Sequence, residues 1–184
     1  KRFRSEYFIL ENAFYIMAPG LYFPVTGIEN IVKQYTAQDY LIDRRYRYFY
    51  LYFDRLESSA DFERLRDLVE NIYTNDYLNK QIVNWNQSLT AADGKSGLPQ
   101  QLDFYSRCVR TARERTVVII SDALRYEVGR TLFERLQADE KCTATLSAMQ
   151  AVLPSYTRFG MAALLPHKRI ELCPDLRVTV DGKP

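Results

Sequence analysis

The spacing of apolar residues divides the chain into two parts of different character. Up to about residue 89, apolar side chains recur every three or four positions, with interruptions at Pro19-Gly20 and at Ser58-Ser59. This period is typical of amphipathic helices, because 3.6 residues complete one turn. We therefore expect helices over residues 5–17, 28–56, 62–73 and 76–89, and Ser58-x-x-Asp61 is a weak capping box before the third.

The second part contains a run that predicts a buried strand. Val117 to Ile120 is apolar without a break, and Asp122 follows it after a single serine. Residues 124–136 then return to helical spacing. Runs of β-branched residues with no polar alternation are typical of strands covered on both faces in parallel sheets. In such sheets ligands bind beyond the carboxyl ends of the strands, where Asp122 would stand.

A second strand, turn and helix follow. Residues 142–152 alternate small and apolar side chains like a strand, and Thr157 then stands at the predicted start of a helix that Pro166 closes. A hydroxyl at a helix N-terminus faces free backbone N–H groups, which favour an anion or an activated alcohol. The simpler interpretation is that Thr157 caps its helix and Asp122 caps the helix after it. An acid and a hydroxyl after two strands of one sheet would instead face one crevice.

These elements predict an α/β protein with two regions. The Gly- and Pro-containing loop 90–99 separates a helical module, residues 1–95, from the opening strands of an α/β domain, residues 96–184, which begins with a short helix over 101–112. The segment 177–180 has strand character, and the turn Asp181-Gly182 after it normally leads to a partner strand, which does not follow. We therefore expect an excerpt of a larger protein.

Composition excludes several classes of protein. The 184 residues carry a formal charge of +2, and no apolar run approaches the ~20 residues of a membrane span. The three cysteines are an odd number without C-x-x-C spacing, which indicates reduced thiols and favours a cytoplasmic protein. The charge is too small to predict nucleic-acid binding.

Two segments of the second part closely resemble one family. Residues 118–128 and 152–168 are similar to the PglZ family of BREX phage-defence phosphatases, most like its type A members. Upstream, residues 42–50, 69–78 and 103–105 are similar to the helical region that precedes the catalytic domain in that family. The resemblance covers most of the chain.

The resemblance implies an alkaline-phosphatase-like fold, truncated here. It implies divalent metal ions, first Zn and otherwise Mn or Mg, with Asp122 as a metal ligand and Thr157 as both nucleophile and ligand. A coordinated metal lowers the pKa of an alcohol. It also implies a cytoplasmic phosphatase or phosphodiesterase that acts on a phosphate ester or nucleic acid alongside other BREX proteins. The alternative is a non-catalytic scaffold or nucleic-acid-binding component of a defence complex.

The single histidine limits what these residues can do alone. His167 follows Pro166, and we expect it to be a loop residue with no metal role. A two-metal site with nitrogen ligands needs more than one imidazole, so we expect the site to be incomplete and these 184 residues alone to be inactive.

Three other groups of charged residues admit functional and structural interpretations. Arg125 could hold a phosphate or the Asp122 carboxylate, or form a surface salt bridge. Glu127 is expected to complement the helix dipole rather than act as a general base. The segment Arg44-Arg45-Tyr46-Arg47-Tyr48 is expected to place its charges on a solvated helix face while its aromatic rings pack.

Overall fold

The computed structural model describes residues 3–18, 20 and 22–183, and the chain forms two compact units. Unit 1 comprises residues 1–96 together with 126–134, and unit 2 comprises residues 97–125 together with 135–184. The division into a helical module and a phosphatase-like domain at residues 95 and 96 stays a prediction. No helix of the described part has the length and apolar character to cross a membrane.

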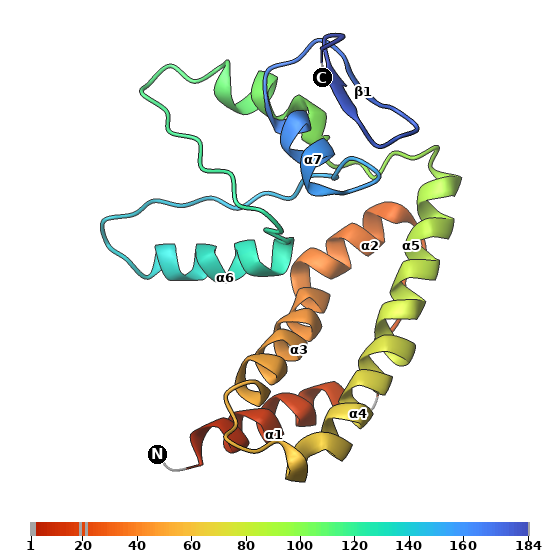
Figure 1. Cartoon of the computed structure of the whole chain (residues 1–184), viewed down its shortest axis with the longest axis vertical. Helices are drawn as coiled ribbons and strands as arrows, with labels where there is room; N and C mark the ends of the chain where they lie inside the picture. Colours follow the sequence, from red (N-terminus) through yellow and green to blue (C-terminus); the bar gives the residue numbers. More distant parts are fainter. Residues whose placement is uncertain (1–2, 19, 21, 184) are drawn as a thin grey trace. The chain divides into compact units, whose positions relative to one another are not determined.

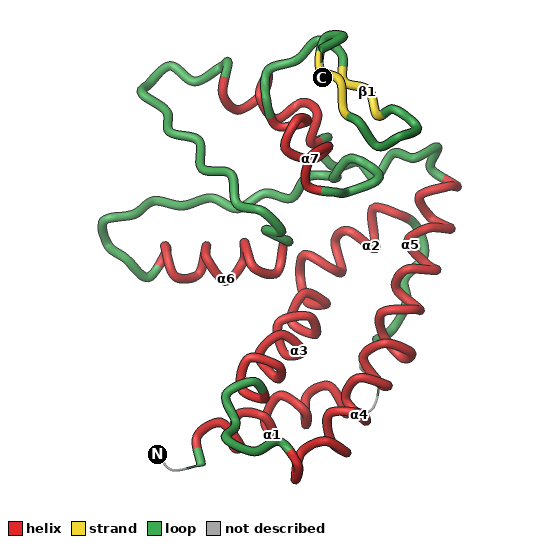
Figure 2. Tube along the Cα trace, viewed as in Figure 1, coloured by secondary structure: helices red, strands yellow, loops and turns green. Residues whose placement is uncertain are grey.

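Unit 1 is built from helices (Figures 1 and 2). The predicted first helix is confirmed as α1, and the predicted helix over 28–56 is confirmed as a continuous run of α2, a π-helical turn η1, and α3. The elements are α1 (Arg4–Met17), α2 (Ile28–Gln34), η1 (Tyr35–Asp39), α3 (Tyr40–Phe53), η2 (Ala60–Phe62), α4 (Glu63–Asn71), η3 (Ile72–Leu78) and α5 (Asn79–Ala91). The first nine residues of α6 (Tyr126–Gln137) also belong to unit 1.

The predicted break between residues 73 and 76 is wrong. Helix α4 passes through the π-helical segment η3 into α5 without interruption. Polar side chains bond along the helix here: Asn75 donates to Asn71, and Asn79 donates to Asn75. The predicted capping box is also wrong, since neither η2 nor α4 has a side-chain hydrogen bond at its N-cap.

The core of unit 1 is aromatic. Phe49 is fully buried at its centre, and Tyr73 stacks on Tyr46 with ring centroids 3.7 Å apart. Phe49 and Tyr73 belong to one buried cluster, against which Tyr46 packs; its other members are Ile9, Ala13, Ile16, Ile42, Val69 and Tyr77. The tyrosine hydroxyls find polar partners, as buried phenols usually do, and Tyr73 donates to Asp43 at 2.9 Å.

The prediction that the arginines of α3 lie on a solvated face is wrong for Arg44 and Arg47. Arg47 is only 31% exposed and Arg44 only 16%, because both side chains face acids of α6. Arg47 binds the carboxylate of Glu127 through Nε and Nη2, at 3.0 and 2.7 Å, and Glu127 is 1% exposed. Glu127 does stand in the first turn of α6, but its partner is a guanidinium on another helix.

Unit 2 has less regular structure. Its elements are η4 (Gln101–Asp103), the π-helix η5 (Tyr105–Val109), the last turn of α6, α7 (Thr157–Leu164), β1 (Ile170–Leu172) and β2 (Val178–Val180). Strands β1 and β2 are antiparallel, with Ile170 opposite Val180 and Leu172 opposite Val178. The predicted strand near residue 177 is thus confirmed, but its partner precedes it rather than following the Asp181-Gly182 turn.

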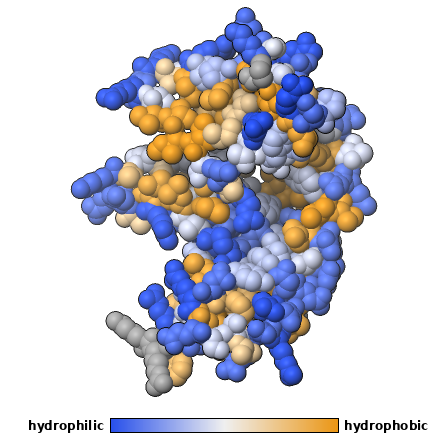
Figure 3. All heavy atoms as spheres, viewed as in Figure 1, coloured by the Kyte–Doolittle hydropathy of each residue, from blue (hydrophilic) through white to orange (hydrophobic). Residues whose placement is uncertain are grey.

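The two strands predicted to open an α/β sheet are not present. Residues 117–120 form no ladder with other described residues, and Val117 and Ile119 are 76% and 88% exposed. Hydrophobic residues reach the surface on the face of the molecule shown in Figure 3. Residues 142–152 keep alternating exposure but pair only through one isolated parallel bridge, Gln100 with Gln150. A strand needs a neighbour for its N–H and C=O groups, and the described residues provide none here.

The observed fold is therefore mostly helical with a small two-stranded sheet. The predicted α/β class, with its truncated alkaline-phosphatase-like domain, is only partly reflected in these elements.

Candidate metal and phosphate site

Asp122 lies in a tight turn between the extended segment 117–120 and helix α6. Its Oδ1 accepts a hydrogen bond from the N–H of Ala123 at 3.0 Å. Ala123 has a φ of 53°, a left-handed conformation that costs a residue with a Cβ about 1 kcal/mol or more. Asp122 does not cap α6, whose N-cap is Arg125 without a side-chain bond. The carboxylate is exposed.

Thr157 is the first residue of α7, which confirms the predicted helix start. Tyr156 is the N-cap, with extended backbone angles, and no side chain caps the helix. The hydroxyl of Thr157 is therefore not used as a cap. Tyr156 fixes the entry to the helix instead, because its hydroxyl donates to the carbonyl of Leu176 at 2.6 Å.

Gln101 holds the start of α7 in place, and sequence reasoning did not single it out. Its Nε2 donates to the carbonyl of Gly160 at 3.1 Å, and its Oε1 accepts from the N–H of Val152 at 3.0 Å. Its backbone N–H donates to Gln150 at 2.9 Å. One side chain thus ties α7 to the segment that leads into it. In the sequence, Gln101 is recognisable only as a polar residue at the start of the predicted helix 101–112.

The structure brings Asp122 and Thr157 together within unit 2, although no sheet joins them. Thr157 Oγ1 lies 3.3 Å from Asp122 Oδ1 and 3.4 Å from Oδ2. A good hydroxyl–carboxylate hydrogen bond is about 2.5–3.0 Å long, so this contact is weak and shared between two oxygens. The chain leaves Asp122 and returns to it at Thr157 after thirty-four intervening residues.

The oxygen separation fits two ligands of one small cation. Zinc–oxygen bonds are about 2.0–2.2 Å long, and two oxygens at tetrahedral angles then lie about 3.3–3.6 Å apart. The observed 3.3 and 3.4 Å fall in this range. A carboxylate and an alcohol are oxygen donors, which Mg²⁺ and Mn²⁺ also accept.

Two donors are too few for a tight site. Across residues 3–18, 20 and 22–183, no group of three or more His, Cys, Asp or Glu side chains is placed to hold a metal ion. His167 does not join Asp122, since its Nδ1 bonds the carbonyl of Leu165 at 2.8 Å. Arg125 is exposed and forms no ion pair with Asp122 in the described structure, so its predicted role stays a prediction.

The charge of unit 2 suits an anionic ligand. It contains twelve Lys and Arg against eight Asp and Glu, a formal charge of +4, while unit 1 contains thirteen against fifteen, a charge of −2. The formal charge of +2 for the whole chain hides this asymmetry. A local excess of positive charge raises the concentration of phosphate-bearing ligands near the surface.

Comparisons with known proteins give the family of this region. Residues 104–184 match the family described as BREX system PglZ alkaline phosphatase-like domain. The chain is 42% identical over 159 residues to the alkaline phosphatase-like protein PglZ of Bacillus cereus (strain H3081.97), covering 83% of the chain. It is 36% identical over 150 residues to the alkaline phosphatase-like protein BrxZ of Escherichia coli O9:H4 (strain HS), covering 75% of the chain.

The alignments cover 19% and 17% of these two relatives, so the chain spans less than a fifth of their length. No solved structure matches the chain. Both Asp122 and Thr157 lie inside the matched region. The resemblance predicted from the sequence is confirmed, and the chain belongs to the PglZ family of BREX phage-defence systems.

Proposed function

We propose that Asp122 and Thr157 belong to the active site of a metal-dependent phosphoric ester hydrolase in the full-length protein. The observation that supports this most directly is the approach of the Thr157 hydroxyl to the Asp122 carboxylate, at 3.3 and 3.4 Å. Membership of an alkaline phosphatase-like family adds to it. The substrate is a phosphate ester or a nucleic-acid phosphodiester, and other BREX proteins are the partners.

In this proposal Thr157, Asp122 and the N-terminus of α7 have different roles in the reaction. Thr157 Oγ1 attacks phosphorus and loses its proton to water. A new P–O bond forms as the bond to the leaving oxygen breaks, and that oxygen takes up a proton from water. Asp122 holds the hydroxyl in position and accepts its hydrogen bond. The first N–H groups of α7 have no intrahelical acceptor, so they and the helix dipole stabilise negative charge at this end. Water then displaces the phosphoryl group from Thr157.

A divalent metal would be held by Asp122 and Thr157 together with ligands from outside the described residues. When bound, it would lower the pKa of the Thr157 alcohol and stabilise charge on the phosphoryl oxygens. Zinc is our first choice, with Mn or Mg as alternatives.

The competing proposal is a non-catalytic component of the defence complex. The small donor set, two oxygens among the described residues, favours this alternative. A scaffold would keep the fold of α7 and its contact with Gln101 without needing the Thr157 hydroxyl.

The test is hydrolysis and metal content of the full-length protein carrying Thr157→Ala, Asp122→Ala or Ser155→Ala. Ser155 is the matched control, since it is an exposed hydroxyl two residues before Thr157. We expect Thr157→Ala to lower kcat at least about a thousandfold, as loss of a nucleophile does. Asp122→Ala should lower both metal content and kcat, while Ser155→Ala should change neither. Full activity of Thr157→Ala, or a wild-type protein that neither binds metal nor turns over, would favour the scaffold.

A further inference from the structure

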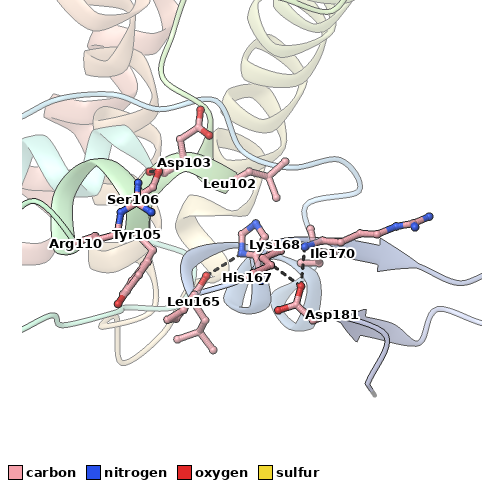
Figure 4. A pocket seen from close by; sticks show the side chains of 12 residues that line it. Leu102, Asp103, Tyr105, Ser106, Arg110, Leu165, His167, Lys168, Ile170 and Asp181 are labelled. Carbon is pink, nitrogen blue, oxygen red and sulfur yellow. Dashed lines mark hydrogen bonds between the residues drawn. The ribbon is translucent and has the colours of Figure 1, made fainter.

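We infer that unit 2 contains a second site, which binds a nucleoside monophosphate, either free or at the 5′ end of a strand. The site is an open pocket of about 700 Å³ between η4–η5 and the segment after α7 (Figure 4). Its volume lies within the range of small-molecule sites, about 300–1,000 Å³. Neither Asp122 nor Thr157 lines it, so this inference does not rest on the function proposed above.

Two cationic side chains in the pocket wall are available for a phosphate. Arg110 directly follows η5 and Lys168 lies in the segment after α7, so they come from segments far apart in the sequence. Neither forms an ion pair with another described residue. Arg169, also in the wall, pairs with Glu171 instead. A guanidinium and an ammonium together suit a phosphate dianion, the first as a planar fork and the second as a point charge.

The acidic residue beside them, Asp181, accepts hydrogen bonds from the backbone. Asp181 Oδ1 accepts the backbone N–H groups of Lys168 and Arg169, at 2.9 and 2.8 Å. These bonds lower the pKa of the Asp181 carboxyl, so it is ionised at neutral pH. The carboxylate thereby fixes the turn that presents Lys168, through two backbone hydrogen bonds to Oδ1.

The rest of the wall suits a nucleoside better than phosphate alone. Tyr105 brings an aromatic ring from η5, and Leu102, Leu165 and Ile170 add apolar surface. An aromatic face stacks on any base. Asp103 supplies a carboxylate that forms no ion pair within the described structure, and it is a suitable acceptor for the exocyclic amino group of a base.

His167 adds a group of defined tautomer. Its Nδ1 faces the carbonyl of Leu165, which can only accept, so Nδ1 carries the hydrogen and Nε2 is an acceptor in the neutral ring. Figure 4 shows the His167 ring inside the pocket with this bond in place. A ribose hydroxyl is a donor of matching chemistry. The pocket thus offers cations for the phosphate, an aromatic ring and a carboxylate for the base, and an acceptor for a ribose hydroxyl.

The experiment is calorimetric titration of the full chain with AMP, adenosine and inorganic phosphate. We expect AMP to bind at least about tenfold more tightly than either part, because only AMP uses both the cations and the ring. Arg110→Gln and Lys168→Gln should each weaken AMP binding about tenfold, the loss of one charge-assisted contact. Arg113→Gln is the matched control, since it removes the same charge from an exposed residue of the same segment outside the pocket.

Three outcomes would overturn the site: no AMP binding by the folded chain, equal binding of AMP and phosphate, or equal losses in Arg110→Gln and Arg113→Gln, which would indicate general charge attraction. Asp122→Ala should bind AMP as the unmodified chain does, which separates this site from the proposed active site. A 5′-phosphorylated dinucleotide that binds more tightly than AMP would identify a strand end as the ligand, and weaker binding would identify the free nucleotide.

Discussion

The segment 117–120 of unit 2 is more apolar than helices α1 and α3 of unit 1, yet it has no side chain as deeply buried as the core residues of those helices. Ile9, Ile16 and Phe49 are fully buried, whereas Ile119 is 88% exposed. A helix satisfies its backbone internally and needs only one packed face, while a strand needs neighbours for both backbone and side chains. Local sequence therefore suffices to bury one face of each helix and not the segment 117–120.

We expect the largest effect from a substitution in the buried core of unit 1. Phe49→Ala removes a fully buried ring from the centre of unit 1, so we expect the free energy of unfolding to fall by about 3–5 kcal/mol. Urea unfolding followed by fluorescence of Trp85, the single tryptophan, reports on unit 1. Phe14→Ala is the control, because Phe14 is 72% exposed on α1, and its loss should be under about 1 kcal/mol. Equal losses would mean that unit 1 is not packed as described.

A smaller effect is expected from the ion pair between α3 and α6. Glu127→Gln removes the carboxylate charge that Arg47 binds through three hydrogen bonds, and we expect a loss of about 2 kcal/mol in the same assay. Glu134→Gln is the matched control, since Glu134 is 40% exposed while pairing with Arg44 and Arg130. Exposed pairs contribute about 0–1 kcal/mol. A loss from Glu134→Gln as large as that from Glu127→Gln would contradict the role of burial.

The buried carboxyl of Asp39 should make unit 1 sensitive to pH. Desolvation raises its pKa above the ordinary aspartate value of 3.8, although Gln34 donates a hydrogen bond to it. The folded state then binds more protons than the unfolded state between 3.8 and the raised pKa, so stability falls as pH rises through this window. We expect Asp39→Asn to stabilise unit 1 at pH 7, by less than Glu127→Gln destabilises it, and to flatten this dependence.

The control for Asp39 is Asp67→Asn, which neutralises an exposed acid of the same unit. It should leave the slope of stability against pH between 4 and 6 unchanged. Destabilisation by Asp39→Asn at pH 7 would show that the ionised carboxylate is favoured in the folded state.

The smallest effect is expected in the exposed segment of unit 2. Ile119→Ala should change the thermal stability of the chain by no more than about 0.5 kcal/mol, because the side chain is in solvent. Hydrogen exchange measured by mass spectrometry should show rapid exchange of the amides of 117–120, which donate no backbone hydrogen bond in the described structure. Slow exchange, or a loss above about 2 kcal/mol, would mean that this segment is paired after all.

Apolar spacing predicted the helices of unit 1 well but not the π-helical turns within them. Val69, Tyr73 and Tyr77 are buried at strict intervals of four. In an α-helix each four-residue step overshoots a full turn by about 40°, so such a row drifts around the axis. The wider turns of η3 absorb this drift and keep the row on the core. A run of core residues spaced strictly by four was the feature of the sequence that could have indicated the π-helical segment.

The sequence predicted that Asp122 and Thr157 lie close together, but the structure achieves this without the predicted sheet. Asp122 and Thr157 were expected to meet at the rim of one sheet, and they lie together through two turns and the bonds of Gln101 instead. Propensity cannot reveal such contacts, because a Gln that bonds residues about fifty positions away looks like any surface Gln. Whether the pair catalyses a reaction stays a prediction.

The membership of α6 in both units has a consequence for a nicked protein. The backbone passes between the units at residues 96–97, 125–126 and 134–135. A single protease cut in the loop near Gly94 would therefore yield two pieces that remain associated, since Glu127 of the second piece still binds Arg47 of the first. The nicked chain should migrate as one species on a native gel and as two bands in detergent.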